Sequence, residues 1–141
     1  MVQFIAGGKG EGKTTKLVGM ANAQLKVTDG NLIFIDDKRR STSDLHYNIR
    51  FIEAGKGILS NYREFAGFVL GILAMDSDIK TIYIDGTNKI IAKFDIEELL
   101  KLSARLEVLS DKYHVDFITC IDWPKEELPP KLQPLAVNLK G

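Results

Sequence analysis

The sequence is poor in residues that cross-link a chain or carry it across a membrane. One cysteine, Cys120, occurs among the 141 residues, which excludes a disulfide framework and a cysteine-rich zinc site. The longest run without a charged residue, residues 65–75, is too short to span a bilayer. The chain opens on an apolar run typical of a strand rather than on a signal peptide. We therefore expect a cytoplasmic protein with no membrane partner.

An excess of charge of either sign is also absent. Lysine plus arginine and aspartate plus glutamate each number 19, so no overall basic charge favours a nucleic-acid coat or a membrane surface. A local basic patch remains compatible with this balance. The length fits one domain, residues 1–141, with a core that buries about two thirds of the surface of the unfolded chain.

What the sequence does contain is an alternation of strand-like and helix-like segments. Near-continuous apolar runs, typical of strands covered on both faces, occur at residues 2–6, 31–35, 81–84 and 115–121. Helical patterns cover residues 14–27 and 60–75, and a third begins after Asp95, where Glu98 completes a capping-box pattern. This order predicts a single-domain α/β fold: a three-layer α/β/α sandwich with a mainly parallel sheet of four or five strands.

Two segments do not fit the alternation. Residues 37–59 form a long stretch with one short strand-like run at 49–53, and we expect a mobile loop there. The tail, residues 123–141, holds all four prolines. It also contains an apolar run at 135–139 that would add a fifth strand.

The most informative feature is a glycine-rich loop directly after the first expected strand. Residues 7–14 fit the pattern G-x-x-x-x-G-K-[ST], and an expected helix follows them. In this setting backbone N–H groups and the positive end of the helix dipole surround a phosphate, which glycine lets the backbone approach closely. A glycine-rich turn that binds nothing is the simpler alternative. The expected nucleotide-binding residues are Gly7, Gly8, Lys9, Gly10, Glu11, Gly12, Lys13, Thr14 and Thr15.

Three side chains of this loop carry separate expectations. Lys13 can reach the β- and γ-phosphates of a nucleotide, and in the empty loop we expect its ammonium group to be solvated. The Thr14 hydroxyl can bind Mg²⁺. We interpret Lys9 as an exposed charge of the loop.

Asp85 follows the apolar run at 81–84 and is the carboxylate that we expect beside the magnesium ion. At the carboxyl edge of a parallel sheet it can hold Mg²⁺, directly or through water, while Thr14 binds from the other side. Asp36, which follows the run at 31–35, competes for this role as a second acid. The simpler alternative is that Asp85 forms a turn with Gly86.

With these two motifs in this order, the chain resembles the P-loop NTPase superfamily over most of its length, and within it the RecA-like branch. The resemblance implies a strand inserted between the two motif strands and catalytic roles for Lys13 and Asp85. It also implies a γ-phosphate sensor near the tip of that strand, at Thr119 or Asp122. The branch usually has a glutamate near Asp85 to polarise the attacking water. Here Gly86 follows Asp85 instead, so we expect slow hydrolysis.

Two narrower resemblances point to different activities. Residues 118–124 are similar to the sensor strand of DNA-pumping and phage-packaging ATPases, although those have glutamine where this chain has Asp122. The loop at 7–15 is similar to that of thymidylate kinases, and residues 36–41 are similar to the acceptor region of nucleoside kinases. Against a kinase, the chain is short for a full acceptor site and lid.

The sequence therefore favours a protein that binds ATP with Mg²⁺ and hydrolyses it slowly within a larger assembly. DNA, a protein partner or further copies of the chain would belong to that assembly, and Arg39 and Arg40 would act as arginine fingers in trans or form a solvated loop pair. A small nucleoside or nucleotide kinase is the first alternative. A non-hydrolysing, nucleotide-dependent interaction module is the second. Another nucleoside triphosphate fits as well as ATP, because such loops contact phosphates rather than bases.

Overall fold

The computed structural model describes residues 1–10, 12–39 and 44–139, and in these residues the chain forms one six-stranded sheet. The strand order is β3-β2-β4-β5-β1-β6, and every neighbouring pair is parallel. The strands are β1 (Val2–Ala6), β2 (Asn31–Asp36), β3 (Arg50–Glu53), β4 (Ile79–Ile84), β5 (Asp116–Ile121) and β6 (Ala136–Asn138). The predicted α/β class and parallel sheet are confirmed.

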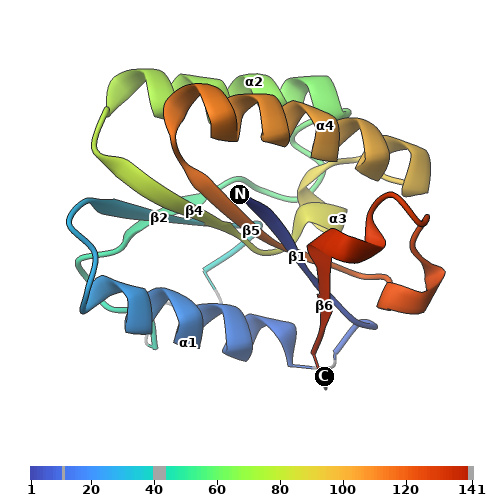
Figure 1. The fold of residues 1–141 in the computed structure, drawn as a ribbon, viewed down its shortest axis with the longest axis horizontal. Coiled ribbons are helices and arrows are strands. Elements are labelled where there is room, and N and C mark those ends of the chain that lie inside the picture. Colours follow the sequence, from blue (N-terminus) through green and yellow to red (C-terminus); the bar gives the residue numbers. More distant parts are fainter. Residues whose placement is uncertain (11, 40–43, 140–141) are drawn as a thin grey trace.

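Helices cover both faces of the sheet. They are α1 (Lys13–Leu25), α2 (Tyr62–Met75), α4 (Ile96–Tyr113) and the short α3 (Thr87–Ile90). Helix α1 lies on one face, while α2 and α4 lie side by side on the other (Figure 1). Two single-turn 3₁₀ segments, η1 (Lys125–Glu127) and η2 (Gln133–Leu135), precede β6. Within the described residues, no helix is both long and apolar enough to cross a membrane.

The alternating side chains of the strands divide the core into two layers. One layer packs against α2 and α4, where the side chains of Phe65 and Leu102 are fully buried. The other packs against α1, where Leu17 meets Ile5 and Phe34. Because both faces of the sheet are covered, its strands are apolar along most of their length, which is the pattern seen in the sequence.

The helix starts follow the capping chemistry only in part. Asp95 accepts a hydrogen bond from the Glu98 N–H at 2.8 Å, as predicted. The reciprocal bond of a capping box is absent from the described residues, where Glu98 Oε2 is buried without a hydrogen-bond partner. Helix α2 begins two residues later than expected, because Asn61 accepts hydrogen bonds from the N–H groups of Arg63 and Glu64.

The expectation of four or five strands is too low, because both short apolar runs outside the main alternation form strands. β3 pairs with β2 along one edge of the sheet, within the segment that we expected to be a loop. β6 pairs with β1 at the other edge, within the proline-rich tail. Of the expected loop at 37–59, residues 40–43 lie outside the described part of the chain.

The strand order brings the carboxyl ends of the central strands to the side of the sheet where the glycine-rich loop lies. β5 lies between β1 and β4, so an inserted strand separates the two motif strands as expected. In a parallel sheet the carboxyl ends of β1, β4 and β5 meet at the same edge. The connection after β1 uses α1 on one face, whereas α2 and α4 cross on the opposite face (Figure 1). Such a switch between faces opens a crevice at the strand ends.

Candidate nucleotide site

The glycine-rich loop, residues 7–14, connects β1 to the first turn of α1. Gly10 and Gly12 adopt left-handed backbone conformations, with φ of 76° and 88°, which glycine accepts without steric cost. Gly12 precedes the helix and supplies no side-chain cap, so the first N–H groups of α1 lack the side-chain acceptor that most helices have. The Gly7 N–H donates to the Trp123 carbonyl at 3.0 Å, which joins the loop to the tail. Glu11 lies outside the described residues.

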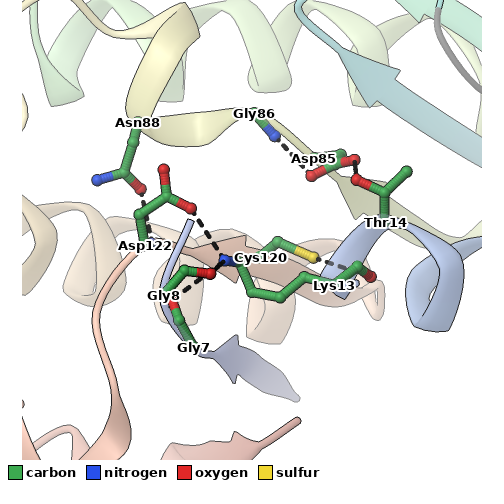
Figure 2. A network of polar contacts seen from close by, with 9 residues as sticks. All are labelled: Gly7, Gly8, Lys13, Thr14, Asp85, Gly86, Asn88, Cys120 and Asp122. Atoms are coloured by element: carbon green, nitrogen blue, oxygen red, sulfur yellow. Dashed lines mark hydrogen bonds and ion pairs between the residues drawn. The ribbon is translucent and has the colours of Figure 1, made fainter. Parts of the chain in front are cut away.

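Lys13 is bound inside the loop rather than solvated, which corrects our expectation for the empty loop. Its ammonium group donates to the carbonyls of Gly7 at 3.1 Å and Gly8 at 2.7 Å (Figure 2). It also forms an ion pair of 3.1 Å with Asp122 Oδ1, and the Lys13 side chain is only 7 % exposed. The carbonyls of a tightly curled loop point at its centre, where they satisfy a cation that burial would otherwise penalise.

Thr14 and Asp85 meet across the cavity edge. The Thr14 hydroxyl donates to Asp85 Oδ2 at 2.5 Å, and Asp85 Oδ1 accepts from the Gly86 N–H at 2.9 Å (Figure 2). Hydroxyl and carboxylate oxygens are the ligands that Mg²⁺ takes in proteins. Asp36 is fully buried, and its Oδ1 accepts from the Asp37 N–H at 2.7 Å. Of the two acids that the sequence offers, Asp85 is therefore the one in contact with Thr14.

A cavity of about 220 Å³ lies between the loop and the ends of β4 and β5. Its walls come from three separate parts of the sequence. They are the glycine-rich loop, the turn after β4 and the end of β5. The lining residues are Lys9, Gly10, Gly12, Lys13, Thr14, Asp85, Gly86, Thr87, Asn88, Lys89, Cys120 and Asp122.

Gly86 and the first three residues of α3, residues 86–89 and together called the β4 turn below, form a wall that sequence reasoning missed. Gly86 adopts a left-handed conformation with φ of 70°, and an added Cβ would lie 2.5 Å from Asp37 Oδ1. Only glycine lets the turn pass this close to Asp37. An Asp-Gly pair after an apolar run was the available signal, but it predicts a turn without saying what that turn lines.

The β4 turn also fixes the tip of β5. Asn88 Oδ1 accepts a hydrogen bond from the Asp122 N–H at 3.1 Å, so the turn and the strand end are joined (Figure 2). Thr119, the other candidate sensor, is fully buried within β5 and is not among the residues that line the cavity. Of the two candidate sensors, Asp122 therefore lies at the cavity, in contact with Lys13.

Cys120 is the one lining residue with a thiol. Burial raises the pKa of this thiol well above its ordinary value, and the Asp85 carboxylate adds to the rise. The thiol therefore stays protonated at neutral pH, and its sulfur lies 3.8 Å from the Lys13 carbonyl, to which it donates. A protonated, buried thiol is a poor nucleophile, so Cys120 serves as packing against the first turn of α1.

The other predicted residues are distributed around the site. Lys9 lines the cavity and is exposed, whereas Thr15 is exposed and does not line it. Arg39 lies outside the lining, 60 % exposed, with its Nε 3.6 Å from Glu53 Oε1 and its guanidinium over the Phe51 ring at 4.8 Å. Arg40 lies outside the described residues.

Neither a scan of protein-family models nor a search of curated proteins finds a match to the chain.

Proposed function

We propose that the chain binds a nucleoside triphosphate, ATP first, with Mg²⁺ in this cavity and hydrolyses it slowly as part of a larger assembly. The observation that carries the proposal is the convergence of Lys13, Thr14, Asp85 and Asp122 on one cavity from three separate segments. A glycine-rich turn without a ligand has no need of a carboxylate brought beside its threonine and another beside its lysine.

The phosphates are bound by the loop and by Lys13. Left-handed glycines and the uncapped start of α1 provide N–H donors for phosphate oxygens. Lys13 now has the Asp122 carboxylate as its anionic partner at 3.1 Å. A phosphate oxygen takes over that position on binding, because the triphosphate group carries more negative charge than the Asp122 carboxylate.

Thr14 and Asp85 fit a magnesium ion. They supply one hydroxyl and one carboxylate oxygen that already lie 2.5 Å apart, and Mg²⁺ characteristically completes its shell with water and phosphate oxygens. The described residues contain no cluster of three or more histidine, cysteine, aspartate or glutamate side chains arranged around a metal. When bound, the ion would neutralise charge on the β- and γ-phosphates.

In the hydrolysis that we propose, a water oxygen bonds to the γ-phosphorus while the bond to the bridging oxygen breaks, releasing inorganic phosphate and the diphosphate. Asp122, at the tip of β5, pairs with Lys13 in the empty site and is the residue to which we assign the sensor role once phosphate has displaced it from Lys13. Gly86, rather than a glutamate that would orient that water, follows Asp85 in the sequence. Turnover is therefore expected to be slow, on the order of one per minute or less, as in NTPases whose site is incomplete alone.

The assembly is proposed from the position of Arg39. It lies outside the cavity of its own chain and is 60 % exposed. An arginine placed this way either stays a solvated group paired with Glu53 or, as we propose, reaches the site of a neighbouring molecule, where such a group raises turnover by roughly 10³ to 10⁵.

One experiment distinguishes hydrolysis, phosphoryl transfer and binding alone. The full chain is incubated with γ-labelled ATP and Mg²⁺, at several protein concentrations, with and without DNA, and with a panel of nucleosides and nucleoside monophosphates. We expect slow release of labelled phosphate, which rises with protein concentration or DNA and falls in an Arg39→Ala variant. Arg63→Ala, on α2 and outside the cavity lining, is the matched control.

Each of three other outcomes would contradict the proposal and favour a different function or none. Transfer of label to one acceptor, with little free phosphate, would establish a kinase. Retention of nucleotide without release or transfer would establish a binding module. If the folded protein retains no nucleotide at millimolar Mg-ATP, the site itself is wrong.

A further inference from the structure

We infer that Lys89, on the β4 turn, contacts the terminal phosphate and makes the site discriminate a nucleoside triphosphate from a diphosphate. This inference rests on the proposed function. It assigns a role to a residue outside both sequence motifs.

The charge of the cavity wall is the first observation. Three lysines, Lys9, Lys13 and Lys89, line the cavity together with two aspartates, Asp85 and Asp122. Lys13 pairs with Asp122, while Lys9 and Lys89 have no ion-pair partner among residues 1–10, 12–39 and 44–139. Because the lysines outnumber the aspartates by one, the described wall carries a net positive charge, which favours an anion.

Backbone hydrogen bonds fix the position of the Lys89 main chain. Its N–H donates to the Gly86 carbonyl at 2.8 Å, and its own carbonyl accepts from the Gly57 N–H at 2.7 Å. Gly86, three residues before Lys89, donates its N–H to Asp85 Oδ1. Lys89 is half-buried, so its side chain has fewer conformations to lose on binding than a fully exposed lysine.

A second polar group on the same turn is left without a partner. Thr87 lines the cavity and is fully buried, and its hydroxyl makes no hydrogen bond within the described part of the chain. Buried polar groups are nearly always satisfied, by protein, water or ligand. The β4 turn therefore carries two polar groups, the Thr87 hydroxyl and the Lys89 ammonium group, that have no partner within the described residues and that a ligand can satisfy.

The position of the turn selects the terminal phosphate. The glycine-rich loop would wrap the phosphates nearest to α1, and Thr14 and Asp85 would hold a magnesium ion that neutralises the charge of the outer phosphates. The β4 turn follows Asp85 directly, so the phosphate on its side of the cavity is the γ-phosphate. A diphosphate would leave Lys89 without its contact.

The test compares two nucleotides on two lysine variants of the full chain. Affinities for Mg²⁺ with a non-hydrolysable ATP analogue and for Mg²⁺ with ADP are measured by titration calorimetry for the wild type, Lys89→Met and Lys89→Arg. Lys93→Met serves as the matched control, because Lys93 is exposed four residues further on and does not line the cavity. Methionine keeps the length of the side chain and removes the charge.

We expect Lys89→Met to weaken binding of the ATP analogue by roughly ten- to a hundredfold, the size of one charge-assisted hydrogen bond. ADP affinity should change by less than about twofold, arginine should restore the preference, and Lys93→Met should change neither affinity. Equal weakening for both nucleotides, or no change for either, would overturn the inference while leaving the proposed function standing. Failure of the wild type to bind either nucleotide would instead overturn both.

Discussion

The glycine-rich loop and the β4 turn line the same cavity, but they hold their lysines in opposite ways. In the loop, Lys13 is 7 % exposed and its ammonium group is bound by two carbonyls and by Asp122. On the β4 turn, Lys89 is half-buried and has no ion-pair partner within the described residues. A ligand must therefore displace an internal anion to reach Lys13, whereas it adds a first partner to Lys89. The two walls should respond differently to the same substitution.

The glycines of the two walls also differ, in the space that surrounds the position of an added Cβ. Gly10, in the loop, has a left-handed backbone and open space around the position of a Cβ. Gly86, on the β4 turn, has a similar φ, but a Cβ there would meet the carboxylates of Asp37 and Asp36 at 2.5 and 3.0 Å. The loop needs glycine for its backbone conformation and for room for a ligand, while the turn needs it for packing within the protein.

The largest effect is expected from Lys13→Ala, measured by thermal melts with and without Mg-ATP. Ligand at a hundred times its Kd stabilises the wild type by about 2.7 kcal/mol, and the variant should lose most of this gain. The unliganded protein should also lose about 1 kcal/mol, because Asp122, 26 % exposed, is left without its cation.

The double variant Lys13→Ala with Asp122→Asn separates these two losses, since it removes the uncompensated charge. Its unliganded melt should recover part of the loss of Lys13→Ala. Lys16→Ala, on the same helix but outside the cavity lining, is the control. An unchanged unliganded melt of Lys13→Ala would mean that Lys13 is solvated and that the contrast with Lys89 is wrong.

A smaller effect, on folding alone, should separate Gly86→Ala from Gly10→Ala. Both substitutions place alanine in a left-handed conformation, at a cost of about 1 kcal/mol each. Gly86→Ala should lose a further 1–3 kcal/mol, roughly, because two carboxylates must move away from the new methyl group. Denaturant unfolding of the unliganded variants measures the difference. Equal losses would show that the β4 turn can relax away from Asp37.

The sequence could predict the parts of the fold that follow from local pattern. Continuous apolar runs marked β1 and β4, and the Asp95 cap marked the start of α4. It expected β6 as a fifth strand but underestimated the sheet by one strand, because β3 is a short edge strand of four residues inside a segment expected to be a loop; β6 itself has only three residues. Strands of that length carry too few residues for a clear pattern, and what holds them is the register with β2 and β1.

The same limit applied to the candidate site. The loop pattern identified Lys13 and Thr14 because a local motif specifies both residues and flanks. The Lys13–Asp122 pair joins residues that are far apart in the chain, and only the position of β5 beside β1 brings them together. Thr87 and Lys89 fit no motif, and their place in the cavity depends on the path of the chain after Gly86.

The smallest effect should come from two threonines that are alike except for their distance from the cavity. Thr87 and Thr119 are both fully buried, and within the described residues neither hydroxyl has a hydrogen-bond partner. Thr87 lines the cavity, whereas Thr119 does not. Valine has the same shape, so it removes an unsatisfied hydroxyl in either variant and should stabilise the unliganded protein by about 1 kcal/mol.

Nucleotide binding should separate the pair. Thr87→Val should weaken binding of Mg²⁺ with a non-hydrolysable ATP analogue by several-fold, because a donor on the β4 turn is lost, on the order of 1 kcal/mol for a neutral hydrogen bond. Thr119→Val should leave that affinity unchanged. Melts of both variants without nucleotide, followed by titration of both with the analogue, provide the comparison. If Thr119→Val weakens binding and Thr87→Val does not, the γ-phosphate is sensed from β5, and the role that we give to the β4 turn belongs to that strand.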